Sequence, residues 1–432
     1  MPVDSEDPEA VIVALAAGTD RGLVASAGPR YFGFVIGGSL PAALASDWLV
    51  SAWDQNAGLY AGSPAASVIE EVVAGWILDL LGLPQKAAVG FVTGGQMANF
   101  TCLAAARHEI LKRAAWDVEA SGLSGAPKVQ IVIGEEAHVT ILSSLRLLGL
   151  GIDRIVRVPS DDQGRMIPSE LRRALASCEP PLIVCAQAGN VNSGAFDGLG
   201  EIGEISHTRQ AWLHVDGAFG LWAAAAPSLR DHTAGMAAAD SWAVDAHKWL
   251  NVPYDCGIAI VAHAGALRAS MGATASYLVS GRGEERDPLE FVPEFSRRAR
   301  GVPVYAALRS LGRRGLADLL ERCCAHARLM AGLLAKSALA RVLNDVVLNQ
   351  VLVRFVPPGG GDADGFTHAV IARVQRDGTC WAGGTAWRGR AAMRISVSNW
   401  STTREDIERS AEAILSAARE EQAACSRRTL VP

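Results

Sequence analysis

The chain has 432 residues, of which 50% are hydrophobic and 20% charged, so it can bury a large core and is not disordered as a whole. Forty basic and 45 acidic residues give a net charge of -5, and no basic cluster is present that would favour a nucleic-acid partner. The amino terminus is acidic, unlike a signal peptide, and no apolar run reaches the roughly 18 residues of a membrane span. We therefore expect a cytoplasmic α/β enzyme that does not associate with membranes.

The cysteines and histidines show no metal-site spacing. The eight cysteines are dispersed and form no CxxC pair, and the nine histidines do not cluster at ligand distances along the chain. We expect reduced thiols and no metal site.

In chain order, residues 1–60 contain one amphipathic helical stretch followed by GPRYFGFVIGGSLP at 28–41. This second segment mixes aromatic residues, glycines and proline, which predicts an irregular pocket wall or arm.

Seven short apolar runs alternate with helical stretches between Pro64 and Ala262, which predicts buried strands joined by helical crossovers. The expected fold is a mostly parallel seven-stranded sheet with helices on both faces. The runs are AVGFVT, VQIVIG, RIVRV, PLIVCA, AWLHVD, SWAVDA and GIAIVA.

Residues 263–302 include the charged stretch GRGEERDPLEFVPEFSRRARG at 281–301, which predicts a long loop of the kind that covers active sites. Helical and strand patterns follow it, and the last helix is expected to begin after Ser401, Thr402 or Thr403. These patterns predict a smaller carboxy-terminal α+β domain.

Two strand ends carry the residues with the strongest chemical signal. DSWAVDAHKWLNVPYDCG at 240–257 places His247 and Lys248 just after a strand, and HVDGAFG at 214–220 places Asp216 at another strand end. A partly desolvated lysine is a nucleophile towards an aldehyde, and in pyridoxal phosphate (PLP) chemistry an aspartate keeps the pyridine nitrogen protonated. The alternatives are a surface lysine and an aspartate that caps a helix.

Further strand ends supply weaker signals. GFVTGGQMANF at 90–100 brings Gly95 and Gln96 to a helix start that could bind phosphate, or could be an ordinary strand-to-helix turn. His138 and the segment Gly189 to Asn192 follow two other strands, and Arg394 lies along a strand of the small domain. A histidine can stack on a cofactor ring or be a core residue, and an arginine can bind a carboxylate or join two domains.

From about Pro29 to Asp406 the chain resembles the PLP-dependent amino acid decarboxylases of the aromatic amino acid decarboxylase type, which have the type I aspartate aminotransferase-like fold. The resemblance is carried by DAHKWLNVPYDCG, HVDGAFG and MRISVSNWSTTREDI, with support from GPRYFGFVIGG, SPAASVIEEVV and TGGQMANF. It implies an amino-terminal segment (1–60), a large PLP-binding domain (61–310), a small domain (311–432) and a homodimer with shared active sites.

The resemblance also implies residue roles. Lys248 would form a Schiff base with PLP, and Asp216 would pair with the ring nitrogen. The other implied contacts are His247 to phosphate or substrate, His138 above the ring, Ala218 beneath it, Gly95 and Gln96 at the phosphate, Asn190 near the cofactor, and Phe34 and Val35 in the substrate pocket, with Arg394 suited to a substrate carboxylate.

Two departures from the family bear on the reaction. The mobile loop of the family carries a tyrosine that donates the last proton, whereas residues 281–301 contain none; Tyr277 precedes them and Phe291 lies within them. Gln96 also stands where the family often has serine. The hypotheses are an amino acid decarboxylase with an aromatic or other uncharged substrate, another PLP reaction (oxygen-using aldehyde synthase, aminotransferase or aldehyde lyase), and a non-catalytic PLP-binding homologue.

Overall fold

All seven predicted strands are present in the computed structural model, which describes residues 1–273 and 285–429. They form one sheet in the order β1-β7-β6-β5-β4-β2-β3. The strands are β1 (Ala88–Val92), β2 (Gln130–Gly134), β3 (Val156–Val158), β4 (Leu182–Gln187), β5 (Trp212–Asp216), β6 (Ser241–Asp245) and β7 (Gly257–Val261).

The prediction of a mostly parallel sheet is confirmed. Strands β2 to β6 pair in parallel, and only β7 runs antiparallel to its two neighbours, β1 and β6. Every residue of β1, β4, β5, β6 and β7 is buried, as expected for strands covered on both faces. The carboxyl ends of β2, β4, β5 and β6 therefore meet at one edge.

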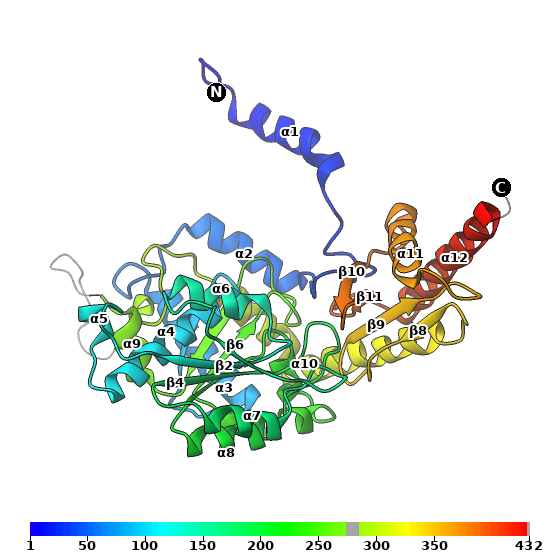
Figure 1. Ribbon diagram of the computed structural model, residues 1–432. Coiled ribbons are helices and arrows are strands. Elements are labelled where there is room, and N and C mark those ends of the chain that lie inside the picture. The colour runs from blue at the N-terminus through cyan, green and yellow to red at the C-terminus, as the bar shows by residue number, and fades with distance from the viewer. Residues whose placement is uncertain (274–284, 430–432) are drawn as a thin grey trace.

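Helices cover both faces of this sheet, and Figure 1 shows α6 on the opposite side from α7 and α8. Strand residues alternate between two hydrophobic clusters: Val184 packs in the larger one, whereas Ile183 and Cys185 pack in the other. The helices are α3 (Pro64–Leu81), α7 (Pro168–Ala176) and α8 (Leu199–Thr208) with the larger cluster, and α4 (Gly95–Arg113), α5 (Val118–Ser121), α6 (Val139–Leu147) and α9 (Ala264–Met271) with the other.

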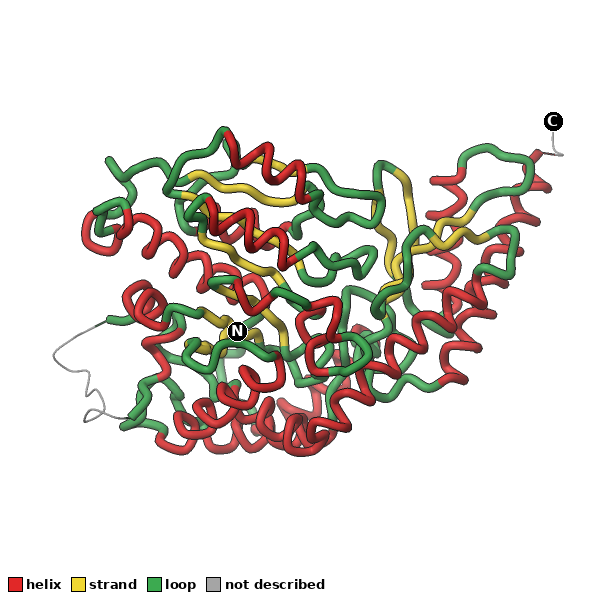
Figure 2. Tube along the Cα trace, turned by 90° about the horizontal axis from the view of Figure 1, so that it is seen from below, coloured by secondary structure: helices red, strands yellow, loops and turns green. Residues whose placement is uncertain are grey.

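A smaller α+β unit follows, as expected, with its helices and strands on the side of the carboxy terminus (Figure 2). Its antiparallel sheet has the strand order β10-β11-β9-β8. The proposed boundary at residue 310 falls inside α10, two residues before a break in helical geometry at Gly312. The elements are α10 (Gly301–Leu334), β8 (Ala340–Val342), β9 (Gln350–Phe355), α11 (Ala363–Asp377), β10 (Gly383–Trp387), β11 (Arg390–Ser396) and α12 (Arg404–Thr429).

Helix α12 begins where the sequence predicted. The Thr403 hydroxyl accepts a hydrogen bond from the Asp406 backbone N–H (3.2 Å), and the Thr403 N–H donates to the Asp406 carboxylate (3.0 Å). Of the three expected capping residues, Thr403 therefore makes the reciprocal pair that satisfies free backbone groups at a helix start.

Two expectations about the connecting segments are wrong. Residues 1–60 hold two helices and a short 3-10 turn, and the first helix buries no residue, so it has no amphipathic packing within the chain. Figure 1 shows α1 standing away from the body. These elements are α1 (Pro8–Thr19), η1 (Asp20–Gly22) and α2 (Pro41–Trp53).

The expected long loop at 263–302 is also not one loop. Residues 264–271 form α9, and the part after the undescribed residues packs on the core through η5 (Pro288–Phe291). The Arg297 guanidinium, with its side chain wholly buried, lies 2.7 Å from the Glu70 carboxylate of α3. This charged stretch packs on the core and is not a solvated loop, because a buried charge such as that of Arg297 is paired there with an opposite charge. The remaining short turns are η2 (Gly220–Ala225), η3 (Arg230–Thr233) and η4 (Met236–Ala238).

Among the described residues, no helix is both long and apolar enough to cross a membrane. Within the same ranges, no cluster of three His, Cys, Asp or Glu side chains could hold a metal ion.

Candidate functional site

A cavity of about 320 Å³ lies at the carboxyl edge of the large sheet. Residues from strand ends, from the amino-terminal segment and from β11 of the small unit meet there. Ten of the eleven residues that the sequence singled out line it: Phe34, Val35, Gly95, Gln96, His138, Asp216, Ala218, His247, Lys248 and Arg394.

Lys248 and its neighbours follow β6. The Lys248 Nζ lies 2.8 Å from Oδ2 of Asp245, whose side chain is only 1% exposed. The Nδ1 of His247 accepts the backbone N–H of Cys256 at 3.1 Å, which leaves Nε2 facing Asp245 Oδ1 at 3.5 Å. Burial lowers the pKa of His247, so this imidazole is neutral at pH 7.

Asp216 ends β5 and is 5% exposed. Its Oδ1 accepts the Ala218 backbone N–H at 3.2 Å, and its Oδ2 accepts Nδ2 of Asn99 at 3.3 Å. Both hydrogen bonds stabilise a negative charge at this point.

A buried polar chain continues behind Asp216. The Oδ1 of Asn99 is 2.9 Å from Nε2 of His214, and Nδ1 of His214 is 2.9 Å from the Ser241 hydroxyl. Burial lowers the pKa of His214 to about 3, so its ring is neutral. With Nε2 protonated, His214 donates to Asn99 and thereby turns the Asn99 amide N–H towards Asp216.

His138 precedes α6 and caps it. Its Nδ1 lies 2.8 Å from the Thr140 hydroxyl and accepts the Thr140 backbone N–H at 3.4 Å. Burial lowers the pKa of His138, although the Asp216 carboxylate acts in the opposite direction. The ring, which is planar in either protonation state, is therefore uncharged at pH 7 and can stack on an aromatic group.

The glycine-rich turn between β1 and α4 forms one end of the cavity. Gly94 and Gly95 lie so close to the segment after β6 that a Cβ on Gly95 would be 2.7 Å from Asp245 Oδ2. The first backbone N–H groups of a helix lack helical partners and carry partial positive charge. Glycine at this position therefore lets the start of α4 lie directly against the Asp245 carboxylate.

Asn190 is the one residue with a predicted role that does not line the cavity. Its Nδ2 donates to Oε1 of Gln187 (3.0 Å), and its Oδ1 accepts the backbone N–H groups of Asn192 and Ser193. The neighbouring Gln187 lines the wall instead. Asn190 stabilises the turn because its short amide reaches its own backbone.

The substrate-side wall comes from the amino-terminal segment. Phe34 and Val35 have φ values of 55° and 63°, a left-handed conformation that is unfavourable for a branched side chain. The ring of Phe34 stacks on Trp381 at 5.5 Å between centroids, which holds this strained turn against the small unit. Arg394 lies nearby, with its guanidinium 3.4 Å from the Val191 carbonyl.

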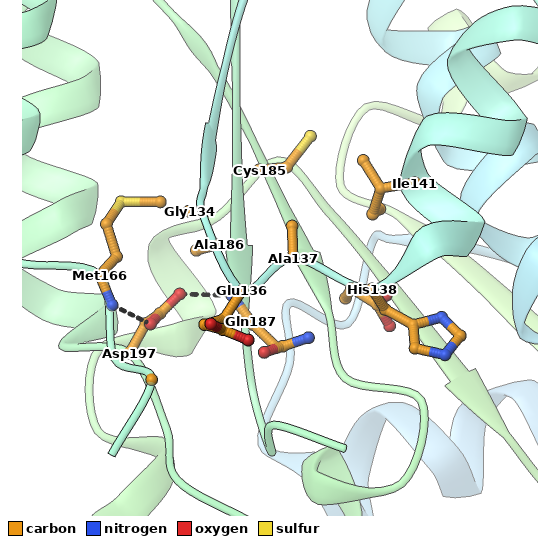
Figure 3. A pocket seen from close by; sticks show the side chains of 12 residues that line it. Gly134, Glu136, Ala137, His138, Ile141, Met166, Cys185, Ala186, Gln187 and Asp197 are labelled. Atoms are coloured by element: carbon orange, nitrogen blue, oxygen red, sulfur yellow. Dashed lines mark hydrogen bonds between the residues drawn. The ribbon is translucent and has the colours of Figure 1, made fainter. Parts of the chain in front are cut away.

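A narrow pocket adjoins the cavity behind His138 and Gln187 (Figure 3). Asp197 lies in it, with its two carboxylate oxygens accepting the backbone N–H groups of Met166 and Gln187, each at 2.7 Å. Asp197 therefore fixes the strand end that carries Gln187.

The cavity fits PLP. It is within the size range of cofactor pockets, and it offers a lysine amine, a buried carboxylate on the neighbouring strand and a glycine-lined helix start for phosphate. Oδ1 of Asp245 is buried without a hydrogen-bond partner, so the cavity wall contains a polar atom whose hydrogen-bonding capacity is unused. Fold and site together define a PLP-dependent enzyme of fold type I.

Comparisons with known proteins give the family. The model for the pyridoxal-dependent decarboxylase conserved domain matches residues 1–356. The chain therefore belongs to the pyridoxal-dependent decarboxylase family, and its enzyme class is that of the PLP-dependent carboxy-lyases.

The relatives are named for different substrates. An aromatic-L-amino-acid decarboxylase of Bacillus atrophaeus is 24% identical over 94% of this chain and 85% of its own length. An L-2,4-diaminobutyrate decarboxylase of Rhizobium meliloti (strain 1021) is 28% identical over 88% of this chain and 75% of its own. A crystal structure of Oryza sativa TDC with PLP and tryptamine superimposes with a TM-score of 0.90 at 24% identity, covering 98% of this chain and 90% of that one.

Sequence reasoning missed several residues of the cavity wall. Asp245 stands three residues before Lys248 at the end of a strand, the same signal that identified Asp216. The other missed residues had no separate signal; they are Thr140, Gln187 and Phe219. From the segment Gly189 to Asn192, which the sequence did single out, Gly189 and Val191 line the cavity.

Proposed function

We propose that this chain decarboxylates an L-amino acid with an aromatic or other uncharged side chain, with Lys248 as the covalent attachment point of PLP. The observation that carries the proposal is that Lys248 and Asp216 line one cavity in a chain of this family. When bound, PLP supplies an electron sink for the bond that breaks at the α-carbon.

The chain's own residues have distinct roles in this proposal. Asp216 would hold the proton on the pyridine nitrogen, and the neutral His138 would stack on the ring. Gly95, Gln96 and His247 would bind the phosphate, and Ala218 would pack below the ring. The Arg394 guanidinium would bind the substrate carboxylate, as its planar donors suit a carboxylate.

The preference for an uncharged side chain follows from the charges on the wall. Among the described lining residues the cations are Lys248 and Arg394, each with a role already proposed. Phe34 and Val35 present apolar surface on the substrate side. An acidic side chain would need a further cation there.

Replacing Lys248 by alanine tests the proposal. We expect loss of the absorption of the lysine-bound cofactor and a fall in turnover of at least about 10³-fold, in the range of removing an essential nucleophile. Products from a panel of amino acids incubated in air with PLP-loaded protein would be identified by mass spectrometry. Full turnover by Lys248→Ala would overturn the assignment, and an amine from uncharged substrates would support it.

The second candidate is oxygen-dependent conversion of an amino acid to an aldehyde. It is favoured by the absence of tyrosine from residues 281–301, since this absence removes the family's proton donor. Tyr277 lies outside the described residues. If the same product assay detects aldehyde, ammonia and peroxide, the chain catalyses this oxygen-dependent reaction and not simple decarboxylation.

We also propose a homodimer. Helix α1 is fully exposed although its sequence, PEAVIVALAAGT, is mostly apolar. Trp48, Leu49 and Trp53 of α2 are between 49% and 66% exposed. Large exposed apolar patches are typical of interaction sites. A second copy of this chain is the proposed partner that covers them.

A further inference from the structure

Asp245 is a buried carboxylate that none of the roles above uses. It ends β6 and is 1% exposed. One oxygen, Oδ2, lies 2.8 Å from Lys248 Nζ, and the other, Oδ1, has no hydrogen-bond partner. A buried carboxylate is costly unless it is paired, so the ammonium group of Lys248 is its main stabilising partner.

The same carboxylate lies at the start of α4. A Cβ on Gly95 would be 2.7 Å from Oδ2, and a Cβ on Gly94 would be 3.7 Å from Oδ1. This is the helix start proposed to bind the cofactor phosphate. An anion is stabilised there by the helix dipole and free N–H groups, and Asp245 is already such an anion.

Of the described titratable groups that surround Asp245, only the Lys248 ammonium group carries a full positive charge at pH 7. The imidazoles of His247 and His138 are neutral at pH 7 because burial lowers their pKa values. Burial raises the pKa of Tyr254 to about 12, and it also raises the pKa of the Cys256 thiol, so both are uncharged. Among the described residues, Lys248 is the only cation within 4 Å of Asp245 when His247 is neutral.

We propose that Asp245 is the counter-ion of Lys248 before PLP binds, and that the cofactor phosphate then enters beside it with uptake of one proton. The inference rests on the proposed attachment of PLP to Lys248. An ionised carboxylate and a phosphate dianion repel each other strongly in a buried space. The proton goes to the carboxylate or to the phosphate, whose second pKa is about 6 in phosphorylated side chains.

The consequence is a pH dependence specific to the phosphate group. Lys248 must lose a proton to bond to any pyridoxal, so the pH dependence of that step is common to PLP and to pyridoxal without phosphate. The ratio of the two dissociation constants removes this shared step. In the natural chain the ratio Kd(PLP)/Kd(pyridoxal) should rise with pH, by up to about tenfold per unit for uptake of one proton.

The experiment measures this ratio by equilibrium dialysis between about pH 7 and pH 9. Asp245→Asn should bind PLP more tightly at the alkaline end and give a nearly constant ratio. Asp255→Asn is the matched control: it removes a carboxylate ten residues further on, which pairs with Arg300 at 2.8 Å. It should behave like the natural chain.

Three results would overturn the inference: a constant ratio in the natural chain, an unchanged slope in Asp245→Asn, or weaker PLP binding by that variant at alkaline pH. If Asp245→Asn does not fold, Asp245→Ser removes the same charge, and the slope in the natural chain is decisive in any case. Failure of the Lys248 assignment looks different, because Lys248→Ala would then bind both pyridoxals as tightly as the natural chain.

Discussion

At the scale of single residues, the site depends on hydrogen bonds that lie behind the cavity wall. Asp216 accepts from Asn99, Asn99 accepts from His214, and His214 contacts Ser241, all of them buried. Each group orients the next, because a neutral imidazole can donate from only one ring nitrogen. The orientation of Asp216 Oδ2 therefore depends on residues that do not line the cavity.

Replacing Asn99 by alanine tests this arrangement. The change leaves Asp216 Oδ2 and His214 Nε2 without partners, and an unsatisfied buried polar group costs about 1–3 kcal/mol. We expect a loss of that size in the free energy of unfolding by urea, together with weaker PLP binding. Thr101→Ala is a suitable control, since this buried hydroxyl of the same helix donates only to the Met97 carbonyl at 2.8 Å. Equal effects of both changes on PLP binding would contradict the proposed orienting role.

Asp197 predicts a pH dependence of stability. Burial raises its pKa to about 6 from the ordinary 3.8, despite two backbone N–H donors. Between these values the folded protein retains a proton that the unfolded chain has lost, so this contribution to stability falls as pH rises from about 4 to 6 and is constant above about 7. The unfolding free energy of the natural chain minus that of Asp197→Asn should show this decline. A difference that rises with pH in the same window would refute it.

At the scale of elements, the segment after the undescribed residues is a fixed part of the fold. The Arg297 guanidinium pairs with Glu70 of α3 and donates to the carbonyls of Ala57 and Phe91, at 2.8 Å each. One arginine thus joins the residues after α2, helix α3 and strand β1. This explains why so charged a stretch lies against the core: its charges and donors have partners there.

Breaking this pair should destabilise the protein strongly. Arg297→Met removes the ion-pair partner of the buried Glu70, and breaking a buried pair typically costs about 3–5 kcal/mol. Adding Glu70→Gln should recover part of the loss, because the remaining charge is then removed. The control is Arg298→Met, whose pair with Asp47 at 2.8 Å is only half-buried, with side chains 36% and 22% exposed. Solvent screens such a pair more than a fully buried one, so its loss should cost less. Urea unfolding of the natural chain and the three variants measures these differences, and similar losses for Arg297→Met and Arg298→Met would contradict the assignment.

At the scale of the whole molecule, the cavity needs parts from both units and from the amino-terminal segment. Arg394 comes from β11, Phe34 from the segment before α2, and Trp381 of the small unit stacks on both Phe34 and Tyr31. Helix α1, in contrast, buries no residue within the chain. The chain therefore exposes apolar residues on α1 and α2, which is the basis for the proposed dimer.

Deletion of residues 1–22 tests the dimer. These residues bury no side chain in the chain itself, so their loss should leave the fold intact. We expect the full chain to sediment as a dimer. The dimer dissociation constant of the shortened chain should be at least about tenfold higher, a loss of about 1.4 kcal/mol in the free energy of association. Analytical ultracentrifugation gives both constants. A monomeric full chain at micromolar concentration would refute the proposal.

Much of the site was predictable from the sequence because the sheet is parallel. Short apolar runs identify the strands, and the carboxyl ends of parallel strands share one edge. Lys248, Asp216 and His138 each follow such a run, so their meeting in one cavity follows from the strand pattern and the topology. The motif resemblance then gave the cofactor, which the family match confirms.

Tertiary structure decided what depends on the direction of a side chain or on the approach of distant segments. The Asn190 side chain points back to its own loop, whereas Gln187 faces the cavity. The hydrogen bonds of Asn190 with Gln187 and with the Asn192 backbone determine these directions. The proposed role of Asp245 depends on its contacts with Lys248 and the start of α4. The stabilising role of Arg297 likewise depends on its ion pair with Glu70. The sequence determines which residues end the strands; packing and desolvation, which act between segments far apart in the chain, determine which of those groups meet and which remain charged.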